Sequence, residues 1–241
     1  MKLIKVGVTI FVVCIVGVAC SSLQNIGNAV VKDATRSTSS GGLTNTDIVK
    51  GLKEALRVGT NNAVTTLNRP GAYFSNSLLK IKFPSEAQQV ASKLRSLGMN
   101  KLVDDFEKSM NTAAEKASVK AKPIFVNAIT SMSINDARGI LTGGNNAATN
   151  YFKSKTKNAL RSAFKPEISK ALNSVNATKY WSDITSTYNK LPMVTKVNTD
   201  LAGYVTDKAL DGLFYKVAQE ELKIRQNPSA RVSDILRKVF G

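Results

Sequence analysis

Three aspartates near the C-terminus share one stripe of a segment with helical periodicity. They are Asp200, Asp207 and Asp211, spaced i, i+7 and i+11. Three carboxylates could hold a divalent cation. A step of seven residues, however, separates Asp200 from Asp207 by about 10 Å along a helix axis, which is too far for one shared ion. We therefore interpret the stripe as structural and expect neither a metal site nor another cofactor.

Two short sequences match the Ser-x-x-Lys pattern of acyl-transfer enzymes, namely Ser77–Lys80 and Ser162–Lys165. Such matches arise by chance in a chain so rich in serine and lysine, and the companion Ser-Asp-Asn and Lys-Thr-Gly motifs are missing. The chain contains no histidine, and its two cysteines are Cys14 and Cys20. Histidine acid–base chemistry and zinc sites built from histidine and cysteine are therefore excluded. We expect no catalytic residues.

The sequence TGGNN, Thr142–Asn146, looks at first like a phosphate-binding loop. A Walker loop follows a strand and ends in Gly-Lys-Ser or Gly-Lys-Thr, and both features are absent here. We interpret the sequence as a corner between helices. Gly143 would end the first helix in the left-handed conformation, and Asn145 or Asn146 would cap the next. The alternative is anion binding at the N-terminus of the second helix.

The helix predicted after this corner carries the densest basic patch of the chain. Lys153, Lys157, Arg161 and Lys165 fall four residues apart on one face. This face is either the solvated side of a basic protein or a contact for anionic lipid head groups and polyanions. We take the four residues as candidate anion-binding residues.

The first twenty residues, MKLIKVGVTIFVVCIVGVAC, have the features of a secretory signal. Lys2 and Lys5 precede the uncharged, mostly apolar run Val6–Ala19. This run is shorter than the roughly 20 apolar residues that cross a bilayer as a helix. We therefore predict a signal peptide over residues 1–19. An uncleaved N-terminal anchor is the alternative.

The sequence GVACSS resembles a bacterial lipobox, in which Cys20 would be acylated and become the mature N-terminus. Gly17 departs from that pattern, so ordinary cleavage near Ala19 stays open. Each buried CH₂ contributes about 0.8 kcal/mol, and three acyl chains would anchor the protein firmly. Ser21 resembles an outer-membrane sorting signal. We expect a domain on the periplasmic side of the envelope, with the outer membrane favoured.

The charge of the chain indicates the class of its partners. It has 34 Lys and Arg against 17 Asp and Glu, a formal net charge of +17. Such an excess favours anionic partners. Behind a secretory signal, lipid head groups and envelope polyanions rank above nucleic acid.

After the signal the pattern indicates a Ser/Thr/Gly-containing tether over residues 20–45 and a mainly α-helical single domain over residues 46–241. The expected core includes Trp181 and the apolar face formed by Leu210, Phe214 and Val217. One departure from an all-α fold is considered. Residues 78–83 alternate apolar and lysine side chains with a period of two, and they could pair with residues 193–197 as two short strands.

Local signals also predict where helices begin and end. Ser85 with Gln88, and Ser133 with Asp136, resemble capping boxes at helix starts. Gly98 stands where a helix would end in the left-handed conformation. Pro123 should break or restart a helix running from about Lys101 to Lys122. Glu221 and Arg225 have the i, i+4 spacing and order of an ion pair.

Two long stretches, DARGILTGGNNAATNYFKSKT and ALDGLFYKVAQEELKIRQNPSARVSDILRKVFG, resemble the bacterial family called domain of unknown function 4197. The resemblance runs from about Ile48 to the last residue. It implies a helical envelope domain, commonly behind a signal peptide. It implies no activity and supplies no catalytic residues.

We expect a non-catalytic binding or scaffolding domain with a basic face. One alternative is a hydrolase of envelope polymers that uses carboxylates or lysines, and it would require an acidic pair in a deep pocket. The other is a carrier of acyl chains, which would require an apolar cavity between helices.

Overall fold

A computed structural model describes residues 44–190, 192–193, 196–231, 234 and 237. The predicted signal peptide, Cys20 and nearly all of the predicted tether lie outside the described residues. Contacts group residues 43–241 into one unit. The hydrophobic core of this unit is built from Leu52 onward, so the unit carries its own core.

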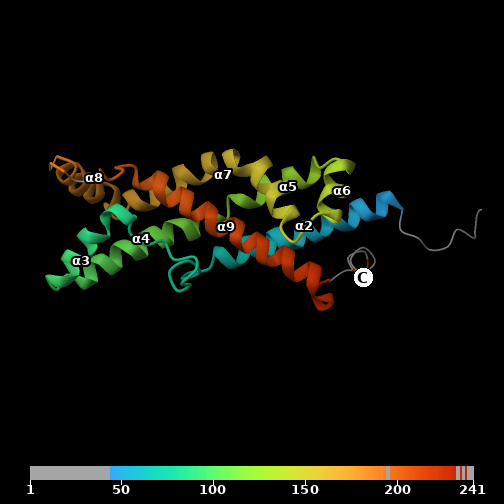
Figure 1. Cartoon of the computed structure of the whole chain (residues 1–241), viewed down its shortest axis with the longest axis horizontal. Helices are drawn as coiled ribbons and strands as arrows, with labels where there is room; N and C mark the ends of the chain where they lie inside the picture. The colour runs from blue at the N-terminus through green and yellow to red at the C-terminus, as the bar shows by residue number, and fades with distance from the viewer. Residues whose placement is uncertain (1–43, 191, 194–195, 232–233, 235–236, 238–241) are drawn as a thin grey trace, which may run out of the picture. The chain divides into compact units, whose positions relative to one another are not determined.

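Every regular element in the described part of the chain is helical, which confirms the all-α prediction. The helices are α2 (Asn45–Leu67), α3 (Gln88–Ser96), α4 (Asn100–Ser118), α5 (Ala121–Thr130), α6 (Ile134–Thr142), α7 (Ala147–Asn173), α8 (Ala177–Tyr188) and α9 (Leu201–Gln226), with single 3₁₀ turns at Ser85–Ala87 and Pro228–Ala230. Among the helices described here, none combines the length and the apolar character that a bilayer span requires. Within the unit, α3 and α8 lie at one end, and α6 and the first turn of α2 lie at the opposite end (Figure 1).

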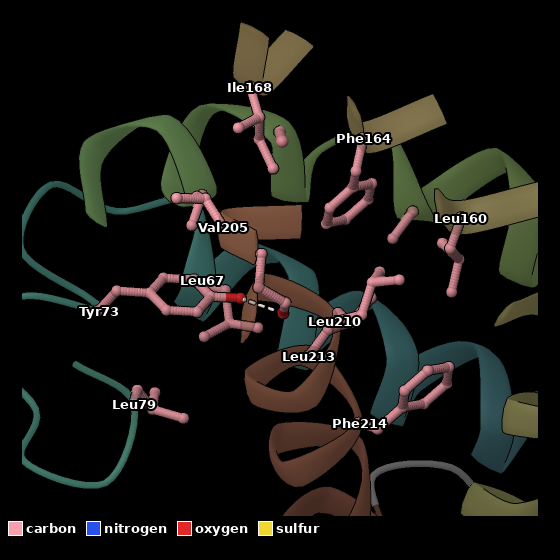
Figure 2. Close-up of a cluster of buried hydrophobic side chains, with 14 of the residues drawn as sticks. Leu67, Tyr73, Leu79, Leu160, Phe164, Ile168, Val205, Leu210, Leu213 and Phe214 are labelled. Atoms are coloured by element: carbon pink, nitrogen blue, oxygen red, sulfur yellow. Dashed lines mark hydrogen bonds between the residues drawn. The ribbon is translucent and has the colours of Figure 1, made fainter. Parts of the chain in front are cut away.

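The core forms where α7 and α9 pack against each other and against α4 and α2. Buried residues recur at every fourth position of α7, all of them apolar except Thr156, and Figure 2 shows Leu160, Phe164 and Ile168 pointing toward side chains of α9. The predicted apolar face of α9 is confirmed, because Leu210, Phe214 and Val217 are all buried. The Phe214 ring lies 6.4 Å from that of Phe125, between centroids.

Tyr73 connects the segment after α2 to α9 through a buried hydrogen bond. Its hydroxyl donates to the Ala209 carbonyl oxygen at 2.8 Å, the bond drawn in Figure 2. Full burial raises the pKa of the Tyr73 phenol far above its ordinary value. A Cβ atom on Gly212 would lie 2.7 Å from the Tyr73 ring. Glycine is therefore required on α9 where this ring crosses it.

The possible pairing of residues 78–83 with residues 193–197 is not present among the residues that the structure describes; residues 194–195 lie outside them. The alternation itself is present, since Leu79, Ile81 and Phe83 are buried and Lys82 is exposed. Two asparagine side chains take the place of a partner strand. The Asn111 amide accepts from Ile81 N–H at 2.8 Å and donates to its carbonyl at 2.9 Å. Asn189 binds Val197 in the same way, at 2.8 Å for both bonds.

Two of the predicted helix signals are confirmed. Ser133 and Asp136 form a reciprocal capping box at the start of α6, with bonds of 3.0 and 3.1 Å. Gly98 has a φ of +80°. The N–H groups of Gly98 and Met99 donate to the carbonyls of Arg95 and Leu94, both at 3.0 Å, as in a Schellman turn.

Two other local predictions need correction. The capping box at Ser85 is wrong: Ser85 opens a 3₁₀ turn, and the cap position of α3 is Ala87, whose side chain has no acceptor atom. The helix predicted from Lys101 to Lys122 is two helices, because α4 ends at Ser118 and α5 restarts at Ala121. Pro123 lies in the first turn of α5, where its missing N–H leaves no helical bond unmade.

Candidate functional site

The turn at Gly98 folds α3 back along α4, and α8 closes the space beside them. These three helices, with the extended segments that Asn111 and Asn189 bind, line a cavity of about 230 Å³ that is partly open to solvent beside Leu102 and Tyr180. Its walls are formed mainly by Phe83, Val90, Leu94, Val103, Phe106, Trp181, Tyr188 and Val197. The lining surface is apolar throughout.

Three aromatic rings form one side of the cavity. The rings of Phe83 and Phe106 lie 4.9 Å apart between centroids, and those of Phe106 and Trp181 lie 5.8 Å apart and nearly parallel. Trp181 is 2% exposed, which confirms its predicted place in the core. Its indole Nε1 donates to the Asn198 carbonyl at 3.0 Å, so its polar atom is satisfied outside the cavity and only its ring lines it.

Thr185 also lines the wall, and its hydroxyl group forms a hydrogen bond to the backbone. Its Oγ1 donates to the Trp181 carbonyl at 2.7 Å, which leaves its methyl group for the wall. An engineered apolar cavity of about 150 Å³ stays dry and binds benzene. A cavity of about 230 Å³ can therefore hold a single ring or a short alkyl chain.

The basic face predicted on α7 is divided between exposed and paired residues. Lys153 and Lys157 are exposed. Arg161 forms an ion pair with Asp207, and Lys165 Nζ lies 2.6 Å from Asp200 Oδ2. The basic stripe of α7 thus faces two aspartates of the acidic stripe on α9.

Asp200 has a second structural contact at the start of α9. Its Oδ1 accepts from the Gly203 N–H at 2.9 Å, which caps the helix. The hydrogen bond from Lys165, and then that from Gly203, lower the pKa of the Asp200 carboxyl. In the part of the chain that the structure describes, no three acidic side chains lie close enough together to hold a metal ion.

The TGGNN sequence is a corner between α6 and α7, but its details differ from the prediction. Gly143 is extended, with a φ of −79°, and not left-handed. Glycine is needed there for space, because a Cβ would lie 2.6 Å from that of Ala147. Asn146 precedes α7 without a capping bond from its side chain.

The first turn of α7 is capped instead by Glu221 of α9. The Glu221 carboxylate accepts from the N–H groups of Ala148 and Thr149 at 2.9 and 2.8 Å. Arg225 completes the cluster: it forms the predicted ion pair with Glu221 at 2.9 Å and donates to the Ile140 carbonyl at 2.8 Å. These amides, which an external anion could have used, therefore bind a carboxylate of the chain itself.

Neither Ser-x-x-Lys match forms a catalytic arrangement. Lys80 Nζ lies 3.0 Å from Glu107 Oε2, and Lys165 is the residue paired with Asp200. Both ammonium groups are thus in ion pairs with carboxylates. The apolar cavity was not predicted as a site, because no local sequence signal marks a space enclosed by three separate helices.

A family model described as "Protein of unknown function (DUF4197)" matches residues 42–241. No curated protein matches the chain significantly, and no solved structure does.

Proposed function

From its membership of the DUF4197 family of proteins of unknown function and from its structure, we propose a role for this chain. It is a bacterial envelope lipoprotein, and its helical domain binds an apolar ligand without changing it chemically. The proposed lipid anchor is Cys20, behind a signal peptide of residues 1–19. The domain would then lie in the periplasm, with the outer membrane favoured.

The observation that carries the binding function is the cavity between α3, α4 and α8. Atoms that line a hollow make fewer dispersion contacts than atoms in a close-packed core. The wall includes small side chains at Ala87 and Val103, where larger ones would reduce the space. A ligand that fills the cavity would recover those contacts.

Hydrolysis is less well supported than binding. Acidic side chains are absent from the described wall of the cavity, and so are lysine and arginine. Three of the carboxylates that a hydrolase could use have structural roles: Glu221 caps α7, Asp200 caps α9, and Asp207 pairs with Arg161. A second role, contact with anionic partners through Lys153 and Lys157, is compatible with the first.

The test uses Trp181, the only tryptophan of the chain, as a reporter within the cavity wall. Titration of residues 43–241 with 1-octanol, a neutral alkyl chain, should change the Trp181 emission in a saturable way. Val90→Phe should weaken this binding, because its ring would occupy part of the cavity. Val126→Phe makes the same change at an exposed position of α5 and should leave the binding intact.

Two results would contradict the proposal. One is the absence of a saturable change in Trp181 emission. The other is an equal loss of binding in Val90→Phe and Val126→Phe, with both variants still folded by circular dichroism.

A further inference from the structure

A second hollow, of about 370 Å³, adjoins the apolar cavity along α4. The two share Leu102, Phe106 and Tyr180 in their walls, so they lie side by side with these residues between them. Beyond these residues the second hollow runs between α4 and the junction of α7 with α8, where Val175 lines it.

Large apolar side chains remain exposed along this path. Leu102 is 52% exposed, Tyr180 57% and Val175 53%. Isolated exposed apolar residues are common, but contiguous ones beside a cavity indicate a binding surface.

The second hollow differs from the cavity because cations line its edge. Lys108, Thr112 and Lys116 follow one another at intervals of four residues on α4, and all three line the hollow. Both lysines are exposed. No carboxylate among the described residues forms an ion pair with either of them.

The nearby acids are paired with other cations. Asp105 also lines the hollow, and its carboxylate lies 2.5 Å from Lys101 Nζ. Glu167 of α7 lies 3.0 Å from Lys120 Nζ. Lys108 and Lys116 therefore leave the edge of the hollow with unbalanced positive charge.

From these contacts we infer that the ligand is an anionic amphiphile with one alkyl chain, such as a fatty acid. Its chain lies in the apolar cavity and passes Leu102 and Tyr180. Its carboxylate binds Lys108, and Lys116 adds positive charge beside it. This inference rests on the proposed function of the cavity and adds the head group to it.

The spacing along α4 suits a molecule of this kind. Lys108 lies six residues beyond Leu102, or about 9 Å along the helix axis, and Lys116 lies about 21 Å beyond it. A lysine side chain can lie along apolar surface and keep its ammonium group in water, so Lys108 can reach toward the cavity. Thr112, between them, offers a hydroxyl donor to the same head group.

The experiment compares octanoate with 1-octanol, which share a chain length and differ in the charge of the head group. Binding to residues 43–241 is followed by Trp181 emission and by calorimetry at low salt. Octanoate should bind at least fivefold more tightly than 1-octanol, and its affinity should fall with salt because exposed charges are screened. Lengthening the carboxylate chain should raise the affinity by about fourfold per methylene until the cavity is filled.

The decisive variant is Lys108→Gln with Lys116→Gln. It should lose the extra affinity for octanoate and keep its affinity for 1-octanol. The matched control, Lys50→Gln with Lys223→Gln, removes the same charge from exposed positions of α2 and α9 and should change neither affinity.

The outcomes separate this inference from the proposed function. If 1-octanol binds but octanoate binds no better, or if both pairs of lysine changes act alike, the head-group site is wrong and the apolar cavity stands. If neither compound binds, both proposals fail. If the Lys108 and Lys116 changes weaken binding only to vesicles of anionic phospholipid, the surface contacts membranes and the amphiphile site is overturned.

Discussion

At the scale of single residues, buried and half-buried polar side chains satisfy backbone groups that regular structure leaves unpaired. Asn111 and Asn189 each bind both the N–H and the carbonyl of one extended residue. Glu221 accepts from the first turn of α7. An unpaired buried backbone group costs about 1–3 kcal/mol, so these three side chains fix segments that would otherwise be unstable.

Glu221 offers the sharpest test of this role. Glu221→Gln removes the charge that faces Arg225, whose side chain is only 15% exposed. Removal of one partner from a buried ion pair costs about 3–5 kcal/mol. Chemical denaturation should show a loss of unfolding free energy of that size.

The neighbouring residue provides the control. Glu220 accepts from Asn62 in an exposed hydrogen bond, so Glu220→Gln should change stability by less than about 0.5 kcal/mol. Similar losses for the two variants would show that the cluster around Glu221 does not hold α6, α7 and α9 together.

Asp200 should make stability depend on pH. Its folded pKa is lowered, so its contribution is present above the unfolded value of about 3.9 and is lost as pH falls through the folded value. Asp200→Ala removes the cap of α9 and should cost about 0.5–2 kcal/mol at pH 7. The difference between wild type and variant, measured by urea denaturation, should shrink below pH 4. A difference that stays constant down to pH 2 would contradict the role of the charge.

At the scale of helices, the stripes on α7 and α9 explain why a basic pattern alone does not define a binding face. Arg161 and Lys165 are paired with aspartates of α9, whereas Lys153 and Lys157 are exposed. A juxtamembrane lysine contributes about 1 kcal/mol near an anionic surface. The two halves of the stripe should therefore behave differently.

We predict that Lys153→Gln with Lys157→Gln weakens binding to anionic vesicles by up to about 2 kcal/mol at low salt and leaves stability unchanged. Arg161→Gln with Lys165→Gln removes the same charge. It should mainly lower stability, by about 0–1 kcal/mol for each exposed pair. Vesicle co-sedimentation and thermal unfolding of residues 43–241 measure the two effects. Equal losses of vesicle binding would show that only net charge matters.

The helices themselves were largely predictable because their signals are local. The capping box at Ser133, the turn at Gly98 and the buried face around Phe214 depend on residues a few positions apart. Some local predictions were still wrong, such as the capping box at Ser85. Other missed features depend on distant partners. Asn111 lies 30 residues from Ile81, and Glu221 lies 72 residues from Thr149. The cavity requires α3, α4 and α8 together, so periodicity within one helix could not indicate it.

At the scale of the whole molecule, the ends of the helical unit have different roles under our proposal. The first turn of α2, which the predicted tether precedes, lies at the end away from α3 and α8 (Figure 1). The cavity therefore lies at the end remote from the attachment point. If residues 20–45 form the tether that their composition predicts, they would span about 25–30 Å.

The anchor itself gives the last prediction. If Cys20 is acylated, Cys20→Ser should release the protein into the soluble fraction of bacterial cells and abolish labelling with a palmitate analogue. Acyl chains supply about 0.8 kcal/mol for each buried CH₂, and the serine variant would lose this attraction. Cys14→Ser is the matched control: it lies within the predicted signal and should leave both localisation and labelling unchanged.

A Cys20→Ser protein that stays in the membrane with its original N-terminus would show that Val6–Ala19 is an uncleaved anchor. A wild-type protein that is soluble and begins near Cys20 without label would support ordinary cleavage instead.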